Sequence, residues 1–488
     1  MASRDSKPLW AALLCIAASL FGSAPAAALP PVSHVGRWLT DPNGRVVVLH
    51  GVQVDRFRPG EPVEYIDLSP ENVQFIAAQG FNVARTSMAY AGVEPSPGVF
   101  DDAYVDSYLA FDRELARAGV YDLIDMMQGE FAAKVGGWGM PDWMALTDGV
   151  PNNAEPYPRG YLDNPAEQRV WDNFWANAAT AGAGLQDRYA AGLRRLAARF
   201  AQAPGLLGWE ILNEPWPGTR TATCASPIGC PPGGFDQTAL TSFYRRVIRA
   251  IRSVDPVHPV IYEPNLLFDF GAATKLGNVG DPNAIFAFHD YCFGAMPGVP
   301  ALPDPLGLCG VQEGMVFANA ERRATTSGDA LLMDEFGATP DTALIRRMTD
   351  EADAHMVGWT WWAYEDCCGN AGAIVRDGTK PPSGDNLNLP VLTALARPYP
   401  QAVAGTPTGW SYDPDAHRFT LTYSTARAGG GTFDPGLVTR VELPPLAYPS
   451  GYRTDIAGAR IVSQPGAERL KLRALPGAAT VRLTVTPA

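Results

Sequence analysis

The chain has 488 residues, of which 46% are apolar and 18% are charged, and its 38 basic and 51 acidic residues give a net charge of -13. This composition is typical of a globular protein with a sizeable core, and the acidic balance argues against a nucleic-acid partner and against electrostatic docking on anionic lipid. The length fits a barrel of about 250 to 400 residues with a small additional domain.

Residues 1–28 are predicted to be a secretory signal peptide. Basic residues precede an apolar stretch over 9–21, and small residues then favour cleavage after Ala26 or Ala28. An uncleaved membrane anchor is the alternative, but the apolar stretch is short for a membrane span. We therefore expect a secreted protein.

Residues 29–398 alternate short apolar segments with amphipathic ones, as βα units do. The clearest expected helix covers 185–200, where apolar residues recur at steps of three or four, and others cover 69–80 and 102–118. Eight strands are expected, at 45–55, 81–85, 120–127, 208–212, 259–263, 284–289, 331–335 and 357–362. The pattern predicts an α/β fold, a (β/α)8 TIM barrel.

The composition changes at 397–407, where prolines and glycines mark a domain boundary. Residues 399–488 then alternate apolar and polar side chains between turns, which predicts a C-terminal β-sandwich. Its expected strands lie at 418–423, 437–443, 460–462, 470–472 and 481–485.

Six cysteines lie beyond the predicted signal peptide, and an even number in an exported protein suggests disulfides. We expect Cys224–Cys230 and Cys292–Cys309, each closing a short loop. The adjacent Cys367–Cys368 pair is harder to place, because a vicinal disulfide is strained and rare. A zinc site is the alternative, but neither a Cys-x-x-Cys nor a His-Glu-x-x-His segment supports it.

Two of the expected barrel strands are followed by a glutamate. The segment WEILNEPWPG brings Asn213 and Glu214 to a strand end that two prolines terminate, and LLMDEFG brings Glu335 to another. Glycoside hydrolysis needs such a pair, one carboxylic acid to protonate the leaving oxygen and one carboxylate to attack the sugar or to activate water. The alternative is that Glu214 caps a helix or is a solvated loop residue.

An Asn-Glu-Pro triplet after a strand, with a second glutamate after a later strand, resembles the retaining β-glycosidases of glycoside hydrolase family 5. The resemblance implies that Glu214 is the acid/base and Glu335 the nucleophile. It also implies that Asn213 binds the sugar 2-hydroxyl. We expect no cofactor and no metal ion.

Other expected strand ends carry candidate substrate-binding residues. The family has an arginine beside the nucleophile, for which Arg85 is the candidate, with a surface ion pair as the alternative. His289 and Tyr291 match the family's His-x-Tyr pattern, although a structural histidine is an alternative. Trp359 and Trp362 are candidates to stack on a sugar ring, but strand alternation requires at least one tryptophan of this strand to pack in the core.

The longer motifs NEPWPG, DEFGAT and RPYPQAVAGTP resemble the endoglycoceramidase branch of family 5, which releases the whole glycan from ceramide. This resemblance extends from about residue 35 to the C-terminus. It implies a glycosphingolipid substrate. We expect contact with membranes only through that substrate, and we expect a monomer. Alternatives are a family 5 endo-β-glucanase and, in a different class, a non-catalytic glycolipid-binding protein.

One segment departs from the branch. Its members typically have Asp-Met-His-Gln-Asp after strand three, whereas this chain has DMMQG at 125–129, so that Met127 and Gly129 replace two polar sugar contacts. Each hydroxyl left unpaired on binding would cost about 1 to 3 kcal/mol. We therefore predict a preference for galactosyl-linked over glucosyl-linked ceramide, as in the endogalactosylceramidase subgroup, with glucosyl preference as the alternative. Gln128 and Glu130 remain candidate sugar contacts, Glu130 as a replacement for one that is lost.

The segment after strand three is also a candidate for the lipid-binding groove, because it is rich in apolar residues as well as in glycine and proline. The alternative is that the segment packs on the barrel top. The candidate groove residues are Phe131, Val135, Trp138, Met140, Trp143 and Met144.

Overall fold

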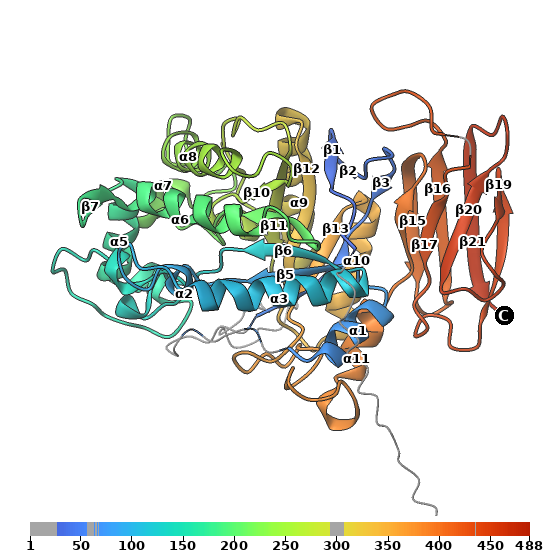
Figure 1. Cartoon of the computed structure of the whole chain (residues 1–488), viewed down its shortest axis with the longest axis horizontal. Helices are drawn as coiled ribbons and strands as arrows, with labels where there is room; N and C mark the ends of the chain where they lie inside the picture. The colour runs from blue at the N-terminus through green and yellow to red at the C-terminus, as the bar shows by residue number, and fades with distance from the viewer. Residues whose placement is uncertain (1–26, 56–62, 64–65, 67, 293–306, 435) are drawn as a thin grey trace, which may run out of the picture.

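The computed structural model describes residues 27–55, 63, 66, 68–292, 307–434 and 436–488. Eight parallel strands close into a barrel, and a two-layered antiparallel sandwich adjoins it (Figure 1). The predicted TIM barrel with a C-terminal β-sandwich is therefore confirmed. The predicted signal peptide lies almost entirely outside the described residues and stays a prediction.

The barrel strands follow one another around the closed sheet in chain order, except for the short β7 and β8 hairpin outside it (Ala179–Thr180 and Ala183–Gly184). They are β4 (His50–Val54), β5 (Val83–Ser87), β6 (Tyr121–Asp125), β9 (Leu206–Glu210), β10 (Val260–Tyr262), β11 (Ala284–Asp290), β12 (Ala330–Gly337) and β13 (Gly358–Trp362). All their residues are buried except Tyr121 and Gly358, which begin β6 and β13 and are partly exposed, as expected for strands enclosed by helices.

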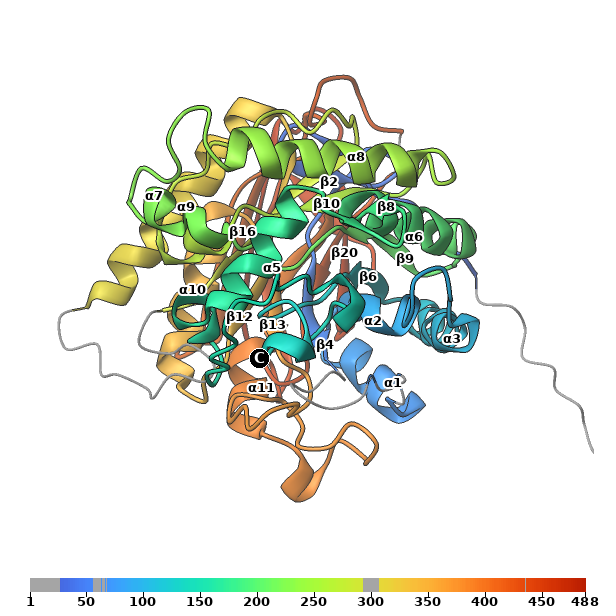
Figure 2. The same cartoon turned by 90° about the vertical axis from the view of Figure 1, so that its left-hand side faces the viewer.

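A ring of helices covers the outside of the barrel (Figure 2). It comprises α1 (Pro70–Ala78), α3 (Asp102–Ala118), α6 (Leu185–Phe200), α8 (Thr241–Arg252), α9 (Leu308–Ser327), α10 (Thr342–His355) and α11 (Leu389–Leu395). Local sequence sets their ends: the Asp101 side chain accepts from the Tyr104 amide at the start of α3, and Gly119 ends it in the left-handed conformation. The predicted helices 102–118 and 185–200 are found with the same bounds.

Shorter elements lie in the segments that follow the barrel strands. They are α2 (Tyr90–Val93), α4 (Gly160–Asp163), α5 (Pro165–Trp175) and α7 (Thr221–Cys224), with short helical turns that include η1 (Ala133–Val135), η2 (Asp142–Met144), η3 (Gly218–Arg220), η4 (Asp236–Leu240), η5 (Leu266–Phe270) and η6 (Gly384–Asn386). In the view along the barrel, α5 lies in front of the strands (Figure 2). These segments therefore build up one end of the barrel.

The first expected strand, 45–55, is divided between two sheets, so the prediction of one continuous barrel strand is wrong. Its first half, Val46–Val47, is β3 and pairs with β14 (Tyr399–Val403) of the sandwich, whereas its second half is the barrel strand β4. A run of β-branched residues favours a strand but does not specify which sheet it joins. The N-terminal strands β1 (Ser33–Val35) and β2 (Trp38–Thr40) extend the same sandwich sheet.

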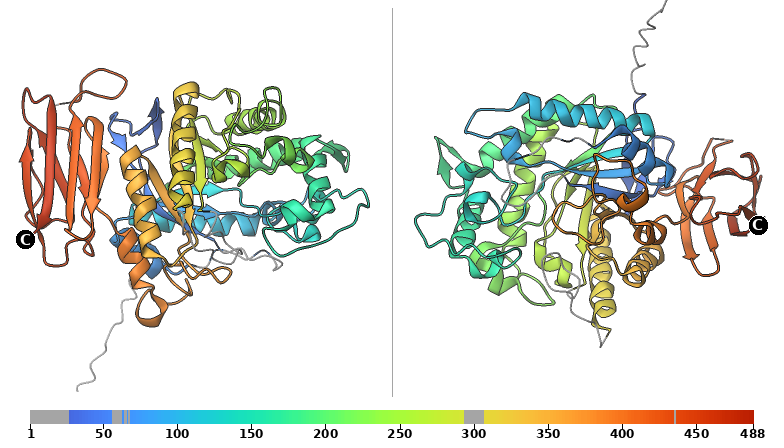
Figure 3. Two further views of the ribbon diagram at one scale, coloured as in Figure 1. Left: turned by 180° about the vertical axis from the view of Figure 1, so that it is seen from behind. Right: turned by 90° about the horizontal axis from the view of Figure 1, so that it is seen from below.

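The sandwich consists of a seven-stranded sheet and a four-stranded sheet. The first contains β1, β2, β3, β14, β17 (Thr439–Glu442), β20 (Arg469–Ala474) and β19 (Ala459–Ile461), and the second contains β15 (Thr406–Asp413), β16 (Arg418–Ser424), β21 (Thr480–Pro487) and β18 (Tyr452–Ala457). Inward-facing side chains of both sheets form one core, in which Trp410, Phe419 and Val441 are buried. Figure 3 shows β1 and β2 beside the barrel in the view from behind.

Buried polar contacts join the barrel to the sandwich. Asp353 of α10 accepts hydrogen bonds from Arg397 (2.9 Å) and from the Trp410 indole (2.7 Å). The ring of Tyr399 stacks on His50 of β4 at 3.9 Å between centroids. The two parts therefore share a structured interface.

The disulfides Cys224–Cys230 and Cys292–Cys309 are formed as predicted, and the structure also joins Cys367–Cys368. Among the described residues, no helix combines the length and the apolar character that crossing a membrane requires.

Candidate active site

The predicted catalytic residues meet at one end of the barrel. Glu335 lies within β12, His289 within β11 and Arg85 within β5, while Glu214 follows β9 by four residues. Glu214 and Glu335 are each 5% exposed, so both carboxyl groups lie in a nearly closed site. Neighbouring parallel strands bring these side chains together because their carboxyl ends lie at the same rim.

Two donors hold the Glu335 carboxylate in place. Arg85 Nη1 donates to Oε2 at 2.5 Å, and the Tyr291 hydroxyl donates to Oε1 at 2.7 Å. Both oxygens are thus bonded, and the guanidinium favours the negative charge of this group. The predicted placement of Arg85 beside Glu335 is found in the structure.

Glu214 has a different environment. Its Oε1 lies 2.9 Å from His289 Nδ1, and its backbone adopts a left-handed φ of 42°. The Glu263 carboxyl accepts from the Glu214 amide at 3.1 Å, and the Gln128 side chain donates to the Glu214 carbonyl at 3.1 Å. These bonds hold the backbone in a conformation that non-glycine residues rarely adopt.

The surroundings of Glu214 favour a carboxyl that keeps a proton near neutral pH. Burial raises its pKa to about 7, although Arg85 and a hydrogen bond from Asp269 oppose that rise. Burial lowers the pKa of His289 to about 4, so its ring is neutral at neutral pH. Because Arg85 can only donate to His289 Nε2 (3.5 Å), the ring hydrogen lies on Nδ1 and points to Glu214.

His289 also fixes the separation of the two carboxyl groups. Its Nδ1 lies 2.9 Å from Glu214 Oε1 and 3.8 Å from Glu335 Oε1. These two oxygens are therefore no farther apart than the two distances combined. This upper bound admits the separation of about 5 to 5.5 Å that is typical of a retaining pair and excludes the wide end, about 9 Å, of the inverting range.

Arg85 is the central cation of the site and is fully buried. It donates to Glu210 through Nε (2.8 Å) and Nη2 (2.5 Å), to Gln53 Oε1 (2.6 Å) and to Asn213 Oδ1 (2.8 Å). Burial opposes the charge of Glu210, but the Arg85 charge outweighs that effect and lowers the pKa of Glu210 to about 2. The rigid guanidinium thus orients both Asn213 and Glu335.

Trp359 does not reach the site, so its predicted stacking on sugar is wrong. Its side chain is fully buried between His50, at 4.3 Å between ring centroids, and Phe81 and Phe336 on the outer side of the barrel wall. Trp362, on the opposite face of β13, is 6% exposed and stays the candidate. Strand alternation places the two tryptophans on opposite faces of β13, so only one of them can face the site.

The Gln128 side chain is buried and bonds backbone groups of the site, so the prediction that it contacts sugar is wrong. It is fully buried; its amide nitrogen donates to the carbonyls of Asn213 (2.8 Å) and Glu214 (3.1 Å), and its oxygen accepts from the Phe131 amide (3.0 Å). These bonds use its amide hydrogens. Gln128 therefore positions the Asn213–Glu214 backbone.

Glu130 is also buried, at 1% exposure, and its carboxyl lies against Gly160 at the start of α4. Burial raises the pKa of Glu130 to about 7. The predicted replacement of a lost sugar contact by Glu130 is therefore wrong for this conformation, because the side chain turns toward α4.

The predicted lipid groove after strand three is wrong as well, because the segment packs into the barrel core. Phe131, Val135, Met140 and Met144 are at most 3% exposed and belong to the main core cluster. Trp143 is half-buried and donates to the Glu94 carbonyl at 2.9 Å.

Trp138 covers the position at which the chain departs from the endoglycoceramidase pattern. A Cβ on Gly129 would lie 2.2 Å from Cζ2 of the Trp138 indole, and this ring packs on Tyr157 at 5.0 Å. Burial raises the pKa of Tyr157 and nearby Glu214 raises it further, which places Tyr157 near the acid/base candidate. An aromatic wall thus occupies the space of a side chain at position 129.

Sequence reasoning missed five polar residues of the site. Four lie on or next to barrel strands, where a charged or amide side chain within an apolar run is a usable signal. The fifth, Asp269, lies in η5 and has no such signal. The missed residues are Gln53, Glu210, Glu263, Asp269 and Asp334.

Two groups of buried side chains are close enough to hold a cation, with candidate ligand atoms within 4.8 Å of one another. One contains Glu210, Glu263, His289 and Asp334, and the other contains Glu214, Asp269 and His289. Arg85 already bonds Glu210 in the first group, so a guanidinium supplies positive charge there.

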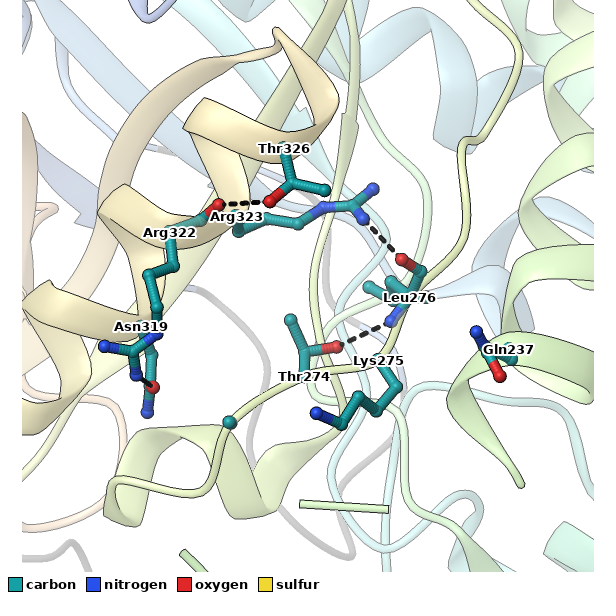
Figure 4. Close-up of a pocket in the computed structure, with 9 residues that line it drawn as sticks. Gln237, Thr274, Lys275, Leu276, Asn319, Arg322, Arg323 and Thr326 are labelled. Atoms are coloured by element: carbon teal, nitrogen blue, oxygen red, sulfur yellow. Dashed lines mark hydrogen bonds between the residues drawn. The ribbon is translucent and has the colours of Figure 1, made fainter. Parts of the chain in front are cut away.

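A separate hollow of about 340 Å³ lies beside α9 and contains none of the residues discussed above (Figure 4). It is therefore distinct from the candidate active site. Its lining residues are Gln237, Ala273, Thr274, Lys275, Leu276, Asn319, Arg322, Arg323 and Thr326.

Comparison with known proteins agrees with this geometry. Residues 64–367 match the model of Cellulase (glycosyl hydrolase family 5), and residues 397–485 match the glycoside hydrolase family 5 C-terminal domain. The chain is 31% identical to endoglycoceramidase I of Rhodococcus hoagii over 459 residues, which cover 91% of this chain and 86% of the relative.

Two solved structures are also similar. Endo-glycoceramidase II from Rhodococcus sp. in its ganglioside GM3 complex aligns with a TM-score of 0.75 and 26% identity, over 92% of this chain and 99% of that one. An endogalactoceramidase aligns with a TM-score of 0.67 and 24% identity, over 94% of this chain and all of that one, a likeness of fold alone.

Proposed function

The chain belongs to glycoside hydrolase family 5, and from this membership we propose that it is a retaining endoglycoceramidase, which cleaves the bond between glycan and ceramide in glycosphingolipids. The observation that carries the proposal is the placement of Glu214 and Glu335 around one His289 nitrogen, at 2.9 and 3.8 Å. These distances allow the separation of about 5 to 5.5 Å at which a carboxylate attacks the sugar directly. The names of the relatives supply the substrate class.

The first chemical step uses the two carboxyl groups in opposite protonation states. Glu335, held by Arg85 and Tyr291, attacks the anomeric carbon. Glu214 gives its proton to the ceramide oxygen as the glycosidic bond breaks. Ceramide leaves with that proton, and the glycan stays bound to Glu335 as an ester.

The second step returns the enzyme to its starting state. Glu214, now a carboxylate, removes a proton from a water molecule, whose oxygen attacks the anomeric carbon and releases Glu335. Both steps need Glu214 to change its protonation near working pH, for which a pKa of about 7 is suited.

The finer proposal is a preference for galactosyl-linked ceramide. It is supported by Met127 and Gly129 at positions where relatives typically carry polar residues, and by the Trp138 ring that covers Gly129. Galactose and glucose differ in the orientation of the 4-hydroxyl, so replacing polar partners by an apolar wall changes which isomer is tolerated. The second candidate is an endoglycoceramidase without this preference, which the names of the relatives favour.

Glycan release from purified glycolipids tests both levels of the proposal. The protein is incubated with galactosyl-linked and lactosyl-linked ceramides, and mass spectrometry identifies the released headgroups. Release of intact glycan and ceramide from either substrate supports the endoglycoceramidase assignment. Hydrolysis of lactosyl-linked substrate alone would refute the galactosyl preference, and no release from either substrate would refute the assignment itself.

Export and oligomeric state are further parts of the proposal. The apolar stretch over 9–21 and the disulfides support a secreted protein. We also propose that it acts as a monomer. N-terminal sequencing of the exported protein tests cleavage after Ala26 or Ala28, and light scattering tests the monomer.

A further inference from the structure

A second carboxyl group lies beside the acid/base candidate. Asp269 belongs to η5, and its Oδ2 lies 3.9 Å from the same His289 Nδ1 that contacts Glu214. Candidate ligand atoms of Glu214, Asp269 and His289 all lie within 4.8 Å of one another. The Asp269 carboxyl also lowers the pKa of Glu214 as a hydrogen-bonding neighbour, and two carboxyl groups can share a hydrogen bond only when one of them carries a proton.

The local backbone holds Asp269 at this place. The Leu266 amide of η5 donates to the carbonyl of Pro215, the residue after Glu214, at 3.1 Å. The Gln312 side chain of α9 donates to the Asp269 carbonyl at 2.9 Å. η5 is thus tied both to the acid/base segment and to the outer helix, so the approach of the two carboxyl groups is built into the fold.

The surroundings of Asp269 favour its protonated form. Its side chain is 2% exposed, and within the described part of the chain its Oδ2 has no N–H or O–H hydrogen-bond partner. Burial raises its pKa, and four other acids raise it further, namely Glu214, Glu335 of β12, Asp290 of β11 and Asp334 of β12. Its facing ring, His289, is neutral, so Asp269 has no cation of its own.

We propose that Asp269 is a positioning residue that keeps a proton and donates it in a hydrogen bond to Glu214, so that the acid/base of this protein works as a carboxyl pair. The inference rests on the proposed retaining mechanism. After Glu214 has protonated the leaving oxygen, it must persist as a carboxylate until water attacks. A hydrogen bond from Asp269 stabilises that buried carboxylate, whereas Arg85 is engaged with Glu210 and Glu335.

Two substitutions separate the hydrogen bond from the packing. Asp269→Asn keeps the side-chain shape and an N–H donor, while Asp269→Leu keeps similar volume and removes the donor. Asp269→Leu should raise the pKa of Glu214, because it removes a hydrogen bond that stabilises the ionised form of Glu214 more than the protonated form. The alkaline limb of kcat/KM on a soluble fluorogenic β-galactoside should then move upward by about one pH unit or more.

A second readout concerns the step in which Glu214 acts as a base. With an activated aryl leaving group, hydrolysis of the glycosyl-enzyme limits kcat, and Asp269→Leu should lower kcat at pH 7 by about tenfold. Asp269→Asn should keep both the wild-type limb and most of kcat. If Asp269→Leu does not fold, as judged by circular dichroism, Asp269→Ala takes its place.

Asp290 provides the matched control. It is fully buried and neither of its oxygens has a hydrogen-bond donor among the described residues, but it faces Glu313, Glu351 and Arg347. Asp290→Asn should leave the alkaline limb in place. An unchanged limb in Asp269→Leu, or an equal shift in the Asn and Leu variants, would overturn the proposal.

A direct titration keeps this test independent of turnover. Carboxyl ¹³C NMR of glutamate-labelled protein follows Glu214, whose signal is identified by its loss in Glu214→Gln. The Glu214 midpoint should rise in Asp269→Leu and stay near the wild-type value in Asp269→Asn. If the protein releases no glycan but shows this shift, the proposed function is refuted and the pairing of Asp269 with Glu214 is supported. If the protein releases glycan but shows no shift, the pairing is refuted and the proposed function is supported.

Discussion

Gly129→Asp, made with and without Trp138→Ala, tests whether an indole has replaced a sugar-binding side chain. A Cβ at 129 would meet three atoms of the Trp138 ring at 2.2 to 2.7 Å. The φ of Gly129 lies outside the left-handed region, so the backbone there accepts other residues. Any cost of the substitution therefore comes from the ring rather than from backbone strain.

The expected magnitudes follow from the packing of Trp138, which is 8% exposed and packs against the tilted ring of Tyr157. Gly129→Asp should lower the free energy of unfolding by about 1 to 3 kcal/mol, as overpacking does. Trp138→Ala should cost up to about 3 to 5 kcal/mol through the cavity that it leaves. In the double variant the carboxylate enters that cavity, so the combined loss should be smaller than the two single losses added together by at least about 1 kcal/mol.

Urea denaturation of the four proteins measures this coupling, and glycan release measures the galactosyl-to-glucosyl ratio. The ratio should shift toward glucosyl substrates only in the double variant, and further when Met127→His is added. Gly409→Asp is the matched control, since no atom lies within 4 Å of a Cβ there and its φ is likewise outside the left-handed region. Additive losses within about 0.5 kcal/mol, or a full shift in ratio with Gly129→Asp alone, would refute the reasoning.

Three further outcomes are expected. Glu335→Gln should abolish turnover, while calorimetry should still detect glycolipid binding. Glu214→Gln should retain measurable activity only on substrates with activated leaving groups. The opposite pattern would exchange the roles of the two glutamates. kcat/KM should fall about tenfold per pH unit above pH 7, because the acid form of Glu214, with its pKa raised to about 7, is lost as pH rises; a pH–rate profile flat to pH 9 would contradict this. Glu263→Leu should lower kcat at least tenfold with little change in KM, because it removes the carboxyl oxygen that accepts the hydrogen bond of the Glu214 amide at 3.1 Å. Glu263→Gln keeps an acceptor and should recover much of the rate.

The barrel could be predicted because the alternation of apolar strand segments with amphipathic helix segments is repeated many times along the chain. Both α3 and α6 carry a periodic apolar face, α3 also has clear end residues in Asp101 and Gly119, and the bounds of both helices agree with the prediction. The residues of β3 carried only a propensity for extended structure. Their partner, β14, lies some 350 residues away in the chain, and no local pattern encodes that pairing.

The catalytic pair could be predicted for a similar reason, since strand ends of a parallel barrel converge on one rim. That rule places Arg85, Glu214, His289 and Glu335 without knowledge of any contact. It does not give the direction of a side chain in the segments beyond the strands. Gln128 and Glu130 are close to the site in sequence but turn away from the sugar position, because backbone carbonyls and α4 supply their partners.

Several of the missed acids surround one arginine. Five carboxyl groups lie within 4.0 Å of the Arg85 guanidinium, those of Asp125, Glu210, Glu263, Asp334 and Glu335. One positive charge cannot stabilise five buried negative charges, and burial raises the pKa of Asp125, Glu263 and Asp334. Burial therefore favours the protonated forms of these three groups, which leaves the guanidinium to Glu210 and Glu335. Their protons keep the Arg85 charge directed at the carboxylate that must attack the sugar, and the same use of buried protons recurs at Asp269 beside the acid that must give one up.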